Sequence, residues 1–286
     1  MITVSAPGKL MLFGEHAVVY GYPCIVTAIS ERLEVTIAGA DDMPEDRRFV
    51  DAAIAAWGGG RDIKLSTKSA FSGTYGFGSS SAVTVATLKA FKPDATNRAV
   101  FDAAYKIVLD IQGVGSGFDV AAAVFGGTMY YIKNKAIEPL VIQDMPLIVG
   151  YTGVKSNTVD LINTVAKKRE QYPEKIERIF GAITKLTEEA KIKMVEGDWE
   201  RVGKLMDFNQ EYLRDLGVSS EKLEALIKAA SDAGAWGAKL SGAGGGDCMI
   251  ALAPPDKREA IEDAITQAGG EVVQVTPNAE GVRVES

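Results

Sequence analysis

A glycine- and serine-rich segment in the first third of the chain limits the possible folds more than any other feature. It reads Gly73-Thr74-Tyr75-Gly76-Phe77-Gly78-Ser79-Ser80-Ser81-Ala82, and apolar and small residues continue from 83 to 91. Glycine allows backbone angles that other residues avoid, and serine is a good first residue for a helix. The unpaired N–H groups at a helix start attract anions, most often phosphate. The segment therefore predicts either a phosphate-binding loop that leads into a helix or an ordinary loop that ends in a helix cap.

The overall composition excludes several classes of protein. The chain has 286 residues, 47% hydrophobic and 24% charged, which suits two domains with modest cores. Its net charge of −7 and its lack of a Lys/Arg block argue against a nucleic-acid surface. Cys24 and Cys248 are too few for a disulfide framework and lack metal-ligand spacing, which favours a reducing compartment. Since there is no basic leader and no run of about 18 apolar residues, we expect a cytoplasmic protein that does not enter a membrane.

Residue periodicity predicts a β-rich region at the start of the chain. We expect strands at 2–5 and 10–13 on either side of a turn at Pro7-Gly8-Lys9, and the second strand resumes at 17–20. Further strands are expected at 24–29, 33–37 and 128–132. Apolar residues at helical spacing then predict an amphipathic helix over 95–112.

Beyond residue 145 the pattern changes to helices interrupted by short strands. Helices are expected at 158–172, 173–195, 198–216, 221–232 and 257–267, and strands at 147–151, 238–240, 248–252, 271–275 and 281–284. This change places a domain boundary near residue 145. The prediction is an α+β protein with domains 1–145 and 146–286.

A second glycine-rich segment presents an acidic residue. The helix over 95–112 ends in Gly113-Val114-Gly115-Ser116-Gly117, and Phe118-Asp119 follows directly. An acid on a turn beside a glycine loop is typical of a catalytic site. The alternative is that Asp119 only stabilises the start of a short helix through the helix dipole.

Three separated motifs together resemble the motif set of the GHMP small-molecule kinases. The first is Pro7-Gly8-Lys9-Leu10-Met11-Leu12-Phe13-Gly14-Glu15-His16, the second is Gly76-Phe77-Gly78-Ser79-Ser80-Ser81-Ala82, and the third is Lys239-Leu240-Ser241-Gly242-Ala243-Gly244-Gly245-Gly246. The resemblance covers nearly the whole chain. It implies a two-domain GHMP kinase fold, in which the first domain is similar to domain 2 of ribosomal protein S5 and the second is ferredoxin-like. ATP would lie between them.

The same resemblance implies roles for single residues. Asp119 matches the catalytic position that accepts or orients the proton of the substrate hydroxyl, and Lys9 matches its partner cation. Ser80 matches the hydroxyl that reaches Mg²⁺. Phosphoryl transfer depends mainly on alignment and charge neutralisation, which these residue types supply. The residues that would bind the nucleotide are Gly76, Phe77, Gly78, Ser79, Ser80, Ser81, Ser241 and Gly244.

Within this family the chain is especially similar to archaeal-type mevalonate kinases. Glu15-His16-Ala17-Val18-Val19-Tyr20-Gly21 carries much of this similarity, with further matches through to the end of the chain. The resemblance implies ATP-dependent phosphorylation of the 5-hydroxyl of mevalonate, with Glu15, His16, Thr158 and Gly242 at the substrate. Two of these residues have simpler readings, because a lone histidine is often structural and Thr158 can be a helix N-cap.

The chain departs from the mevalonate kinase pattern at two places. The glutamate that usually completes the Mg²⁺ shell is Val108 here, and helical spacing turns Asp110 away from that position. The segments 82–87, 115–123 and 246–248 resemble phosphomevalonate kinases instead. Phosphorylation of 5-phosphomevalonate is therefore the alternative activity, and Lys155 is a candidate cation for the extra phosphate, although it can equally be a solvated surface lysine. A related decarboxylase and a non-catalytic member of the fold are further alternatives, and the family resemblance allows a homodimer.

Overall fold

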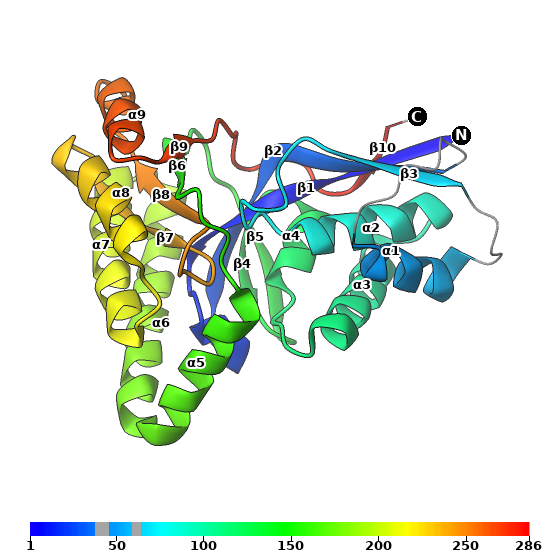
Figure 1. Ribbon diagram of the computed structural model, residues 1–286, viewed down its shortest axis with the longest axis horizontal. Helices are drawn as coiled ribbons and strands as arrows, with labels where there is room; N and C mark the ends of the chain where they lie inside the picture. The colour runs from blue at the N-terminus through cyan, green and yellow to red at the C-terminus, as the bar shows by residue number, and fades with distance from the viewer. Residues whose placement is uncertain (38–45, 59–63, 286) are drawn as a thin grey trace.

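The structure is a computed structural model that describes residues 1–37, 46–58 and 64–285. Its elements form two halves that lie side by side (Figure 1). Both halves combine antiparallel sheets with helices, which confirms the expected α+β class. None of the helices within the described residues combines the length and the apolar composition that a bilayer crossing needs.

The first half is built on a six-stranded antiparallel sheet in the order β10-β1-β2-β4-β5, with β3 also paired to β2. Its strands are β1 (Ile2–Phe13), β2 (Cys24–Ile37), β3 (Leu65–Ser69), β4 (Thr128–Ile132), β5 (Ala136–Leu140) and β10 (Arg283–Val284). A 3-10 helix, η1 (Ala17–Tyr20), connects β1 to β2 where a strand was expected.

The expected turn at Pro7-Gly8-Lys9 is wrong, because β1 runs through it as one strand. The pairing of β1 with β2 shifts register between Pro7 and Lys9 and again between Met11 and Phe13. Such irregularities bend a strand without ending it. The bend keeps Lys9 in the sheet, and its N–H group donates to the Phe77 carbonyl at 2.9 Å.

The helices of the first half lie together on one side of β1, β2 and β3 (Figure 1). They are α1 (Arg48–Ala53), the π-helical turn η2 (Ile54–Gly58), α2 (Ser79–Phe91), α3 (Asn97–Gln112) and α4 (Phe118–Phe125). Residues 81–88 of α2 are all buried, because this helix packs between the sheet and the other helices. The start of α2 is thereby fixed next to β1.

The second half contains the four-stranded antiparallel sheet β7-β8-β6-β9. Its strands are β6 (Leu147–Tyr151), β7 (Gly237–Ser241), β8 (Cys248–Leu252) and β9 (Glu271–Val272), and its helices are α5 (Thr158–Gln171), α6 (Pro173–Glu196), α7 (Trp199–Leu216), α8 (Glu221–Asp232) and α9 (Arg258–Gln267). Helix α7 packs against β7, which is an edge strand of this sheet.

One hydrophobic core continues from the first half into the second. It includes buried residues of β1, β2 and α2 together with Met194 of α6 and Leu205 and Met206 of α7. The last strand, β10, pairs with β1, so the end of the chain returns to the first sheet. The boundary near residue 145 stays a prediction, and the shared core holds the two halves in a fixed relation around the site described next.

Candidate functional site

A cleft of about 500 Å³ lies where the two halves meet. Its walls come from β1, the starts of α2 and α4, the loop after β6, the start of α5 and the loop after β7. The cleft brings together ten of the site residues expected from the sequence. These are Lys9, His16, Gly76, Gly78, Ser79, Ser80, Asp119, Thr158, Ser241 and Gly242.

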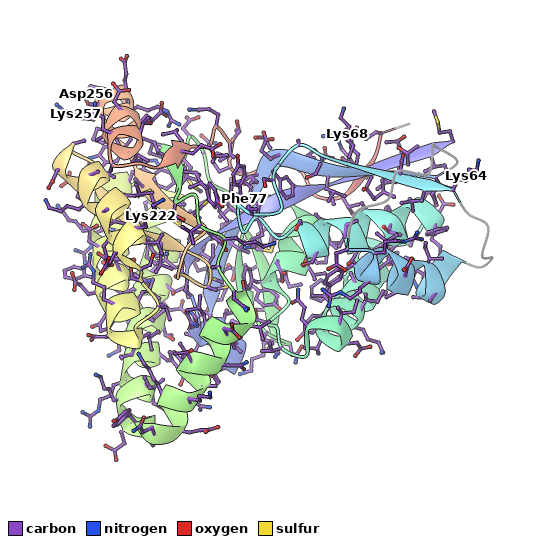
Figure 2. The ribbon with its side chains drawn as sticks, in the orientation of Figure 1. Lys64, Lys68, Phe77, Lys222, Asp256 and Lys257 are labelled. Carbon is purple, nitrogen blue, oxygen red and sulfur yellow. The ribbon has the colours of Figure 1, made fainter. Side chains whose placement is uncertain are left out.

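Phe77, Ser81 and Gly244 do not line the cleft. Phe77 lies near the junction of the two halves (Figure 2), with its ring buried next to Phe71 and Tyr75. Its contribution to the loop is therefore made through its backbone and its packing. Gly244 packs against the Val218 carbonyl so closely that a Cβ would lie 2.1 Å from that oxygen. Phe77 and Gly244 therefore support the conformation of their loops through packing.

Glu15 is placed differently from the expected substrate contact. Its side chain is completely buried, does not line the cleft, and accepts hydrogen bonds from Lys239 and, at 3.3 Å, from Asn209. Burial raises the pKa of Glu15, and the Lys239 charge opposes that shift. Because both carboxylate oxygens already have partners, Glu15 supports the wall behind the cleft.

The second glycine-rich motif, residues 76–82, forms a tight loop beside Lys9. Gly76 and Gly78 have φ angles of +73° and +81°, a region that favours glycine. The Lys9 ammonium donates to the Gly76 carbonyl at 2.8 Å. A Cβ on Gly78 would lie 3.2 Å from Lys9 Cε, so the loop and the lysine are packed closely together.

Helix α2 begins directly after this loop and directs its first N–H groups toward the cleft. Gly78 is its N-cap residue and supplies no side-chain hydrogen bond, so the first N–H groups are available to a ligand. Ser79 and Ser80 line the cleft at this point. Since such a helix start favours negative charge, the arrangement suits a phosphate group.

Asp119 lies in the first turn of α4 and shares the cleft with Lys9. Its Oδ2 atom accepts a hydrogen bond from the Ser81 hydroxyl at 2.6 Å. Burial lowers the pKa of Lys9, and the carboxylates of Asp119 and Asp247 oppose this shift, Asp119 most strongly. A carboxylate, a buried cation and a helix start thus surround one space.

The backbone that leads into α4 is held from behind. The Tyr131 hydroxyl donates to the Ser116 carbonyl at 2.6 Å, and Lys133 donates to the Gly115 carbonyl at 2.9 Å. Gly117, at φ +87°, is the N-cap of α4. These contacts fix the position of Asp119 relative to the cleft.

His16 also lines the cleft and is buried, with a φ angle of +60°. Its Nε2 atom lies 2.9 Å from the Ala243 carbonyl oxygen. Since a carbonyl only accepts, Nε2 carries the proton and Nδ1 is left as an acceptor. Burial lowers the pKa of His16 to about 4, so the ring is neutral near pH 7.

The third glycine-rich motif follows β7 and is attached to the first half. The Ser241 hydroxyl donates to the Met11 carbonyl at 2.9 Å and accepts from the Met11 N–H group at 3.1 Å. Gly242 follows with φ +93°. The side chain of Ser241 is therefore engaged in holding the loop against β1.

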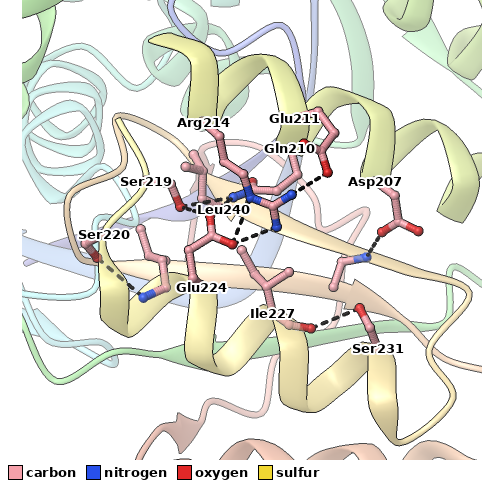
Figure 3. Close-up of polar contacts among 12 residues, drawn as sticks. Asp207, Gln210, Glu211, Arg214, Ser219, Ser220, Glu224, Ile227, Ser231 and Leu240 are labelled. Carbon is pink, nitrogen blue, oxygen red and sulfur yellow. Dashed lines mark hydrogen bonds and ion pairs between the residues drawn. The ribbon is translucent and has the colours of Figure 1, made fainter. Parts of the chain in front are cut away.

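Side chains of α7 complete the hydrogen bonding of β7, as Figure 3 shows. The outward N–H groups of this edge strand donate to α7, from Ala238 to Asp207 at 2.9 Å and from Leu240 to Gln210 at 3.0 Å. The amide of Gln210 in turn donates to Ser219 and Glu224. This network fixes the strand that carries the third motif.

Asp247 is a cleft residue to which the sequence assigned no role. Its carboxylate accepts two hydrogen bonds from Ser156, from the N–H group and from the hydroxyl, each at 2.8 Å. It is 7% exposed and has φ +54°. The signal was the segment Gly246-Asp247-Cys248, which the sequence singled out only for its resemblance to phosphomevalonate kinases.

Thr158 is the first residue of α5, and the N-cap is Asn157, which accepts from the Asp160 N–H group at 3.3 Å. Lys222 at the start of α8 (Figure 2) donates to the Thr152 carbonyl at 2.8 Å and supports the loop before α5. The Thr158 side chain is thus not needed for capping. It has no hydrogen-bond partner among the described residues, and it lines the cleft.

Val108 lines the cleft as an apolar side chain. Asp110 is exposed and pairs with Lys106 at 2.5 Å, so it lies outside the cleft as the helical spacing predicted.

Within residues 1–37, 46–58 and 64–285 no cluster of three or more His, Cys, Asp and Glu side chains could hold a metal. Single oxygen donors such as Ser80 and Asp119 do line the cleft among the residues that the structure describes.

Two family models match the sequence. The model described as GHMP kinases N terminal domain matches residues 47–127, and the model described as GHMP kinases C terminal matches residues 189–271. The two matches include the second glycine-rich motif, the segment around Asp119 and the third glycine-rich motif.

The chain is also similar to individual proteins over nearly its full length. It is 37% identical to a mevalonate kinase of Thermococcus gammatolerans, with 99% of this chain and 98% of that protein covered. The crystal structure of L. major mevalonate kinase in complex with R-mevalonate is 26% identical, covers 96% of this chain and 95% of that chain, and has a TM-score of 0.83. The phosphomevalonate kinase of Streptococcus pneumoniae, in complex with phosphomevalonate and AMPPNP, is 19% identical with a TM-score of 0.82 over 97% and 100% of the two chains, and shows the same fold.

Proposed function

Since the chain belongs to the GHMP kinase family, we propose that it transfers the γ-phosphoryl group of ATP to the 5-hydroxyl of mevalonate. One observation carries the chemistry: Asp119, Lys9 and the start of α2 line a single cleft between the two halves. The full-length similarity to mevalonate kinases supports the choice of substrate.

The nucleotide phosphates are assigned to the start of α2. The N–H groups after Gly78 and the hydroxyls of Ser79 and Ser80 supply donors there, and the helix dipole adds favourable charge. Phosphoryl transfer needs little covalent help from the protein, so fixed donors of this kind account for much of the expected acceleration.

Asp119 is assigned to the substrate hydroxyl. Ser81 occupies Oδ2, which leaves Oδ1 to accept the hydrogen bond of that hydroxyl. The hydroxyl oxygen forms a bond to the γ-phosphorus while the bond from phosphorus to ADP breaks, and the proton passes to the carboxylate. Lys9 stands beside this exchange and offsets the negative charge that collects on the transferred group.

Mg²⁺ is proposed to arrive with the nucleotide. It prefers oxygen donors and keeps several waters and phosphate oxygens, so a full protein cage is not required. The Ser80 hydroxyl fits this role because it lines the cleft and its only hydrogen bond within the described residues is a long one, from Gln112 at 3.3 Å. When bound, the ion would neutralise phosphate charge.

The substrate is proposed to lie between His16 and Thr158. A neutral His16 offers Nδ1 as an acceptor for a substrate hydroxyl. Thr158 offers a hydroxyl that the helix cap does not use. Gly242 brings the backbone of the third motif to the same space.

Phosphorylation of 5-phosphomevalonate is the second candidate, and the sequence of residues 115–123 favours it. A phosphorylated substrate needs an additional cation in the cleft. Lys155 lines the cleft and could meet that need. The measurement below separates the two substrates.

The test is ADP release with Mg²⁺ and ATP, in the presence of mevalonate or of 5-phosphomevalonate, with the product identified by mass. We expect turnover of mevalonate. Asp119→Asn should lower kcat by about 10²- to 10⁴-fold and leave ATP binding by calorimetry unchanged, because it removes a transition-state interaction. Turnover of phosphomevalonate alone would replace the proposed activity by the second candidate, and no turnover of either would reject both.

A further inference from the structure

Three side-chain cations line the cleft within the described residues, and two of them have partners. Lys9 donates to the Gly76 carbonyl at 2.8 Å. Arg48 donates to both carboxylate oxygens of Asp46, from Nε at 2.9 Å and from Nη2 at 2.7 Å. Lys155 forms no hydrogen bond or ion pair with any described residue, although it lines the same cleft. Lys155 is therefore the one of these three cations that no described residue engages.

The backbone on both sides of Lys155 is fixed by Asp247. The Asp247 N–H group donates to the Val154 carbonyl at 2.7 Å, and its carboxylate accepts from the N–H group and hydroxyl of Ser156 at 2.8 Å each. Thr152 adds hydrogen bonds to the Asp247 carbonyl from its N–H group at 2.9 Å and from its hydroxyl at 3.0 Å. Lys155 is exposed, whereas the residue that holds the chain on both sides of it, Asp247, is only 7% exposed. Here the residues before and after Lys155 are both held by Asp247, Val154 through the Asp247 N–H group and Ser156 through the Asp247 carboxylate.

We propose that Lys155 is the cation that binds the carboxylate of the substrate, and that Asp247 is the positioning residue that holds Lys155 at the cleft. The inference rests on the proposed function, because it assumes an acid with an alcohol at its other end. Lys155 would then determine that the protein prefers a substrate with a carboxylate to a neutral alcohol.

The charges around the cleft agree with this assignment. Among the described residues three carboxylates line the cleft, those of Asp46, Asp119 and Asp247, and they would repel the carboxylate of a substrate. Binding of that carboxylate therefore requires a cation in the cleft. Lys9 is shielded from it, because it lies close to both Asp119 and Asp247. Lys155 precedes Thr158 by three residues and both line the cleft, so a carboxylate bound by Lys155 would lie near the hydroxyl that is proposed to contact the substrate.

The first experiment compares Lys155→Met and Lys155→Arg with Lys167→Met. Lys167 lies on α5, is exposed and does not line the cleft, so its substitution controls for the loss of one positive charge. Each variant is assayed with mevalonate and with 3-methylbutane-1,3-diol, which keeps the reacting hydroxyl and lacks the carboxylate. We expect Lys155→Met to raise the KM for mevalonate about tenfold, as for a partly exposed charge pair, with kcat and the KM for ATP within about twofold.

The decisive quantity is the acid-to-diol ratio, which is kcat/KM for mevalonate divided by kcat/KM for the diol. It should fall about tenfold in Lys155→Met, recover in Lys155→Arg and stay unchanged in Lys167→Met. A structural role would lower activity toward both alcohols and leave the ratio unchanged. If the ratio does not fall in Lys155→Met, the proposal is wrong, whether or not total activity changes.

The positioning role of Asp247 is tested by Asp247→Ala and Asp247→Asn. The alanine variant removes both hydrogen bonds to Ser156 and should lower the acid-to-diol ratio as Lys155→Met does. The asparagine variant keeps an acceptor for the Ser156 N–H group and should retain most of the ratio. In the double variant Lys155→Met/Asp247→Ala the ratio should fall no further than in Lys155→Met, because both changes remove the same contact, that of Lys155 with the substrate carboxylate. A further, additive fall would overturn the positioning role.

The outcomes separate this inference from the proposed function. If wild-type protein phosphorylates mevalonate and Lys155→Met leaves the acid-to-diol ratio unchanged, the function stands and the inference fails. If wild-type protein turns over only 5-phosphomevalonate, the proposed substrate fails, but that substrate keeps the carboxylate. The comparison is then made between 5-phosphomevalonate and 3-hydroxy-3-methylbutyl phosphate, which lacks only the carboxylate, and an equal loss of affinity for both in Lys155→Met would assign the lysine to the phosphate and overturn the inference.

Discussion

The Lys239 ammonium and the Glu15 carboxylate form an ion pair in which both side chains are completely buried. Lys239 belongs to β7 in the second half of the molecule, and Glu15 follows β1 in the first. Glu15 directly precedes His16, whose ring donates to the Ala243 carbonyl just beyond β7. The pair therefore joins the two halves immediately behind the substrate side of the cleft.

Breaking this pair should destabilise the protein strongly. Lys239→Met leaves the Glu15 charge buried without its partner, which typically costs about 3–5 kcal/mol of the free energy of unfolding. The double variant Glu15→Gln/Lys239→Met should be less destabilised, since no buried charge remains. Urea unfolding of both proteins measures the difference. As a control, Lys228→Met removes an exposed pair with Asp232 and should cost at most about 1 kcal/mol. Equal losses in the single and double variants would argue against an energetic role for the charges.

His16 should make the stability of the protein fall as the pH is lowered. Its pKa is about 4 in the folded protein and 6.5 ordinarily, so below pH 6.5 the unfolded chain binds a proton that the folded protein does not. The contribution is complete above pH 6.5 and is lost between pH 6.5 and 4. At pH 5 the loss is about 2 kcal/mol.

The measurement is the free energy of unfolding at pH 7.5 and pH 5 for wild type and for His16→Asn. Asparagine tolerates the φ angle of +60° and does not titrate. The wild type should lose about 2 kcal/mol more than the variant over this range. Identical pH dependence in the two proteins would show that His16 is not held neutral.

Gly76→Ala should impair the second glycine-rich motif, whereas Gly73→Ala should not. A Cβ on Gly76 would lie 2.5 Å from Asp247 Oδ2, and its φ angle of +73° adds about 1–2 kcal/mol of strain for alanine. A Cβ on Gly73 would meet nothing closer than Ser79 Oγ at 4.0 Å. We expect Gly76→Ala to lower kcat/KM for ATP at least tenfold, about 1.4 kcal/mol, with Gly73→Ala close to wild type. Wild-type kinetics for both would mean that the loop adapts easily.

Gln210→Leu should destabilise β7 more than Asp207→Ala does. Both residues accept from outward N–H groups of this edge strand, but Gln210 is buried and Asp207 is exposed. Leucine leaves the Leu240 N–H group without a partner, at a cost of about 1–3 kcal/mol. Water can replace the Asp207 carboxylate, so its loss should cost less than about 1 kcal/mol. Urea unfolding checks the order, and the reverse order would show that burial does not decide the cost.

The sequence predicted those elements whose signals are local. The helices that begin after Thr96 and Ser220 carry side-chain caps and apolar periodicity, and the structure has them at 97–112 and 221–232. The loop before α2 follows in the same way, because Gly76 and Gly78 take φ angles that few other residues adopt. Motif resemblance then brought Lys9 and Asp119 to one site, although they are far apart in the chain.

The errors occurred where a distant partner decides the conformation. Pro7-Gly8-Lys9 has the composition of a turn, yet β2 pairs with β1 on both sides of it and a shift in register absorbs the irregularity. Glu15 was expected at the substrate, and the structure places it in a buried pair with Lys239 behind the cleft, so its contact with the substrate stays a prediction.

By itself, the sequence determined the α+β class, the conformations of the glycine loops and the identity of the residues offered to phosphate and hydroxyl groups. These properties depend on backbone sterics, helix caps and side-chain chemistry, which act over a few residues. Only the tertiary structure decided that Glu15 faces Lys239, 224 residues away, and that Asp247 holds the loop around Lys155. Such pairings depend on how the two halves pack, because a buried polar group takes whichever partner the packing places within reach.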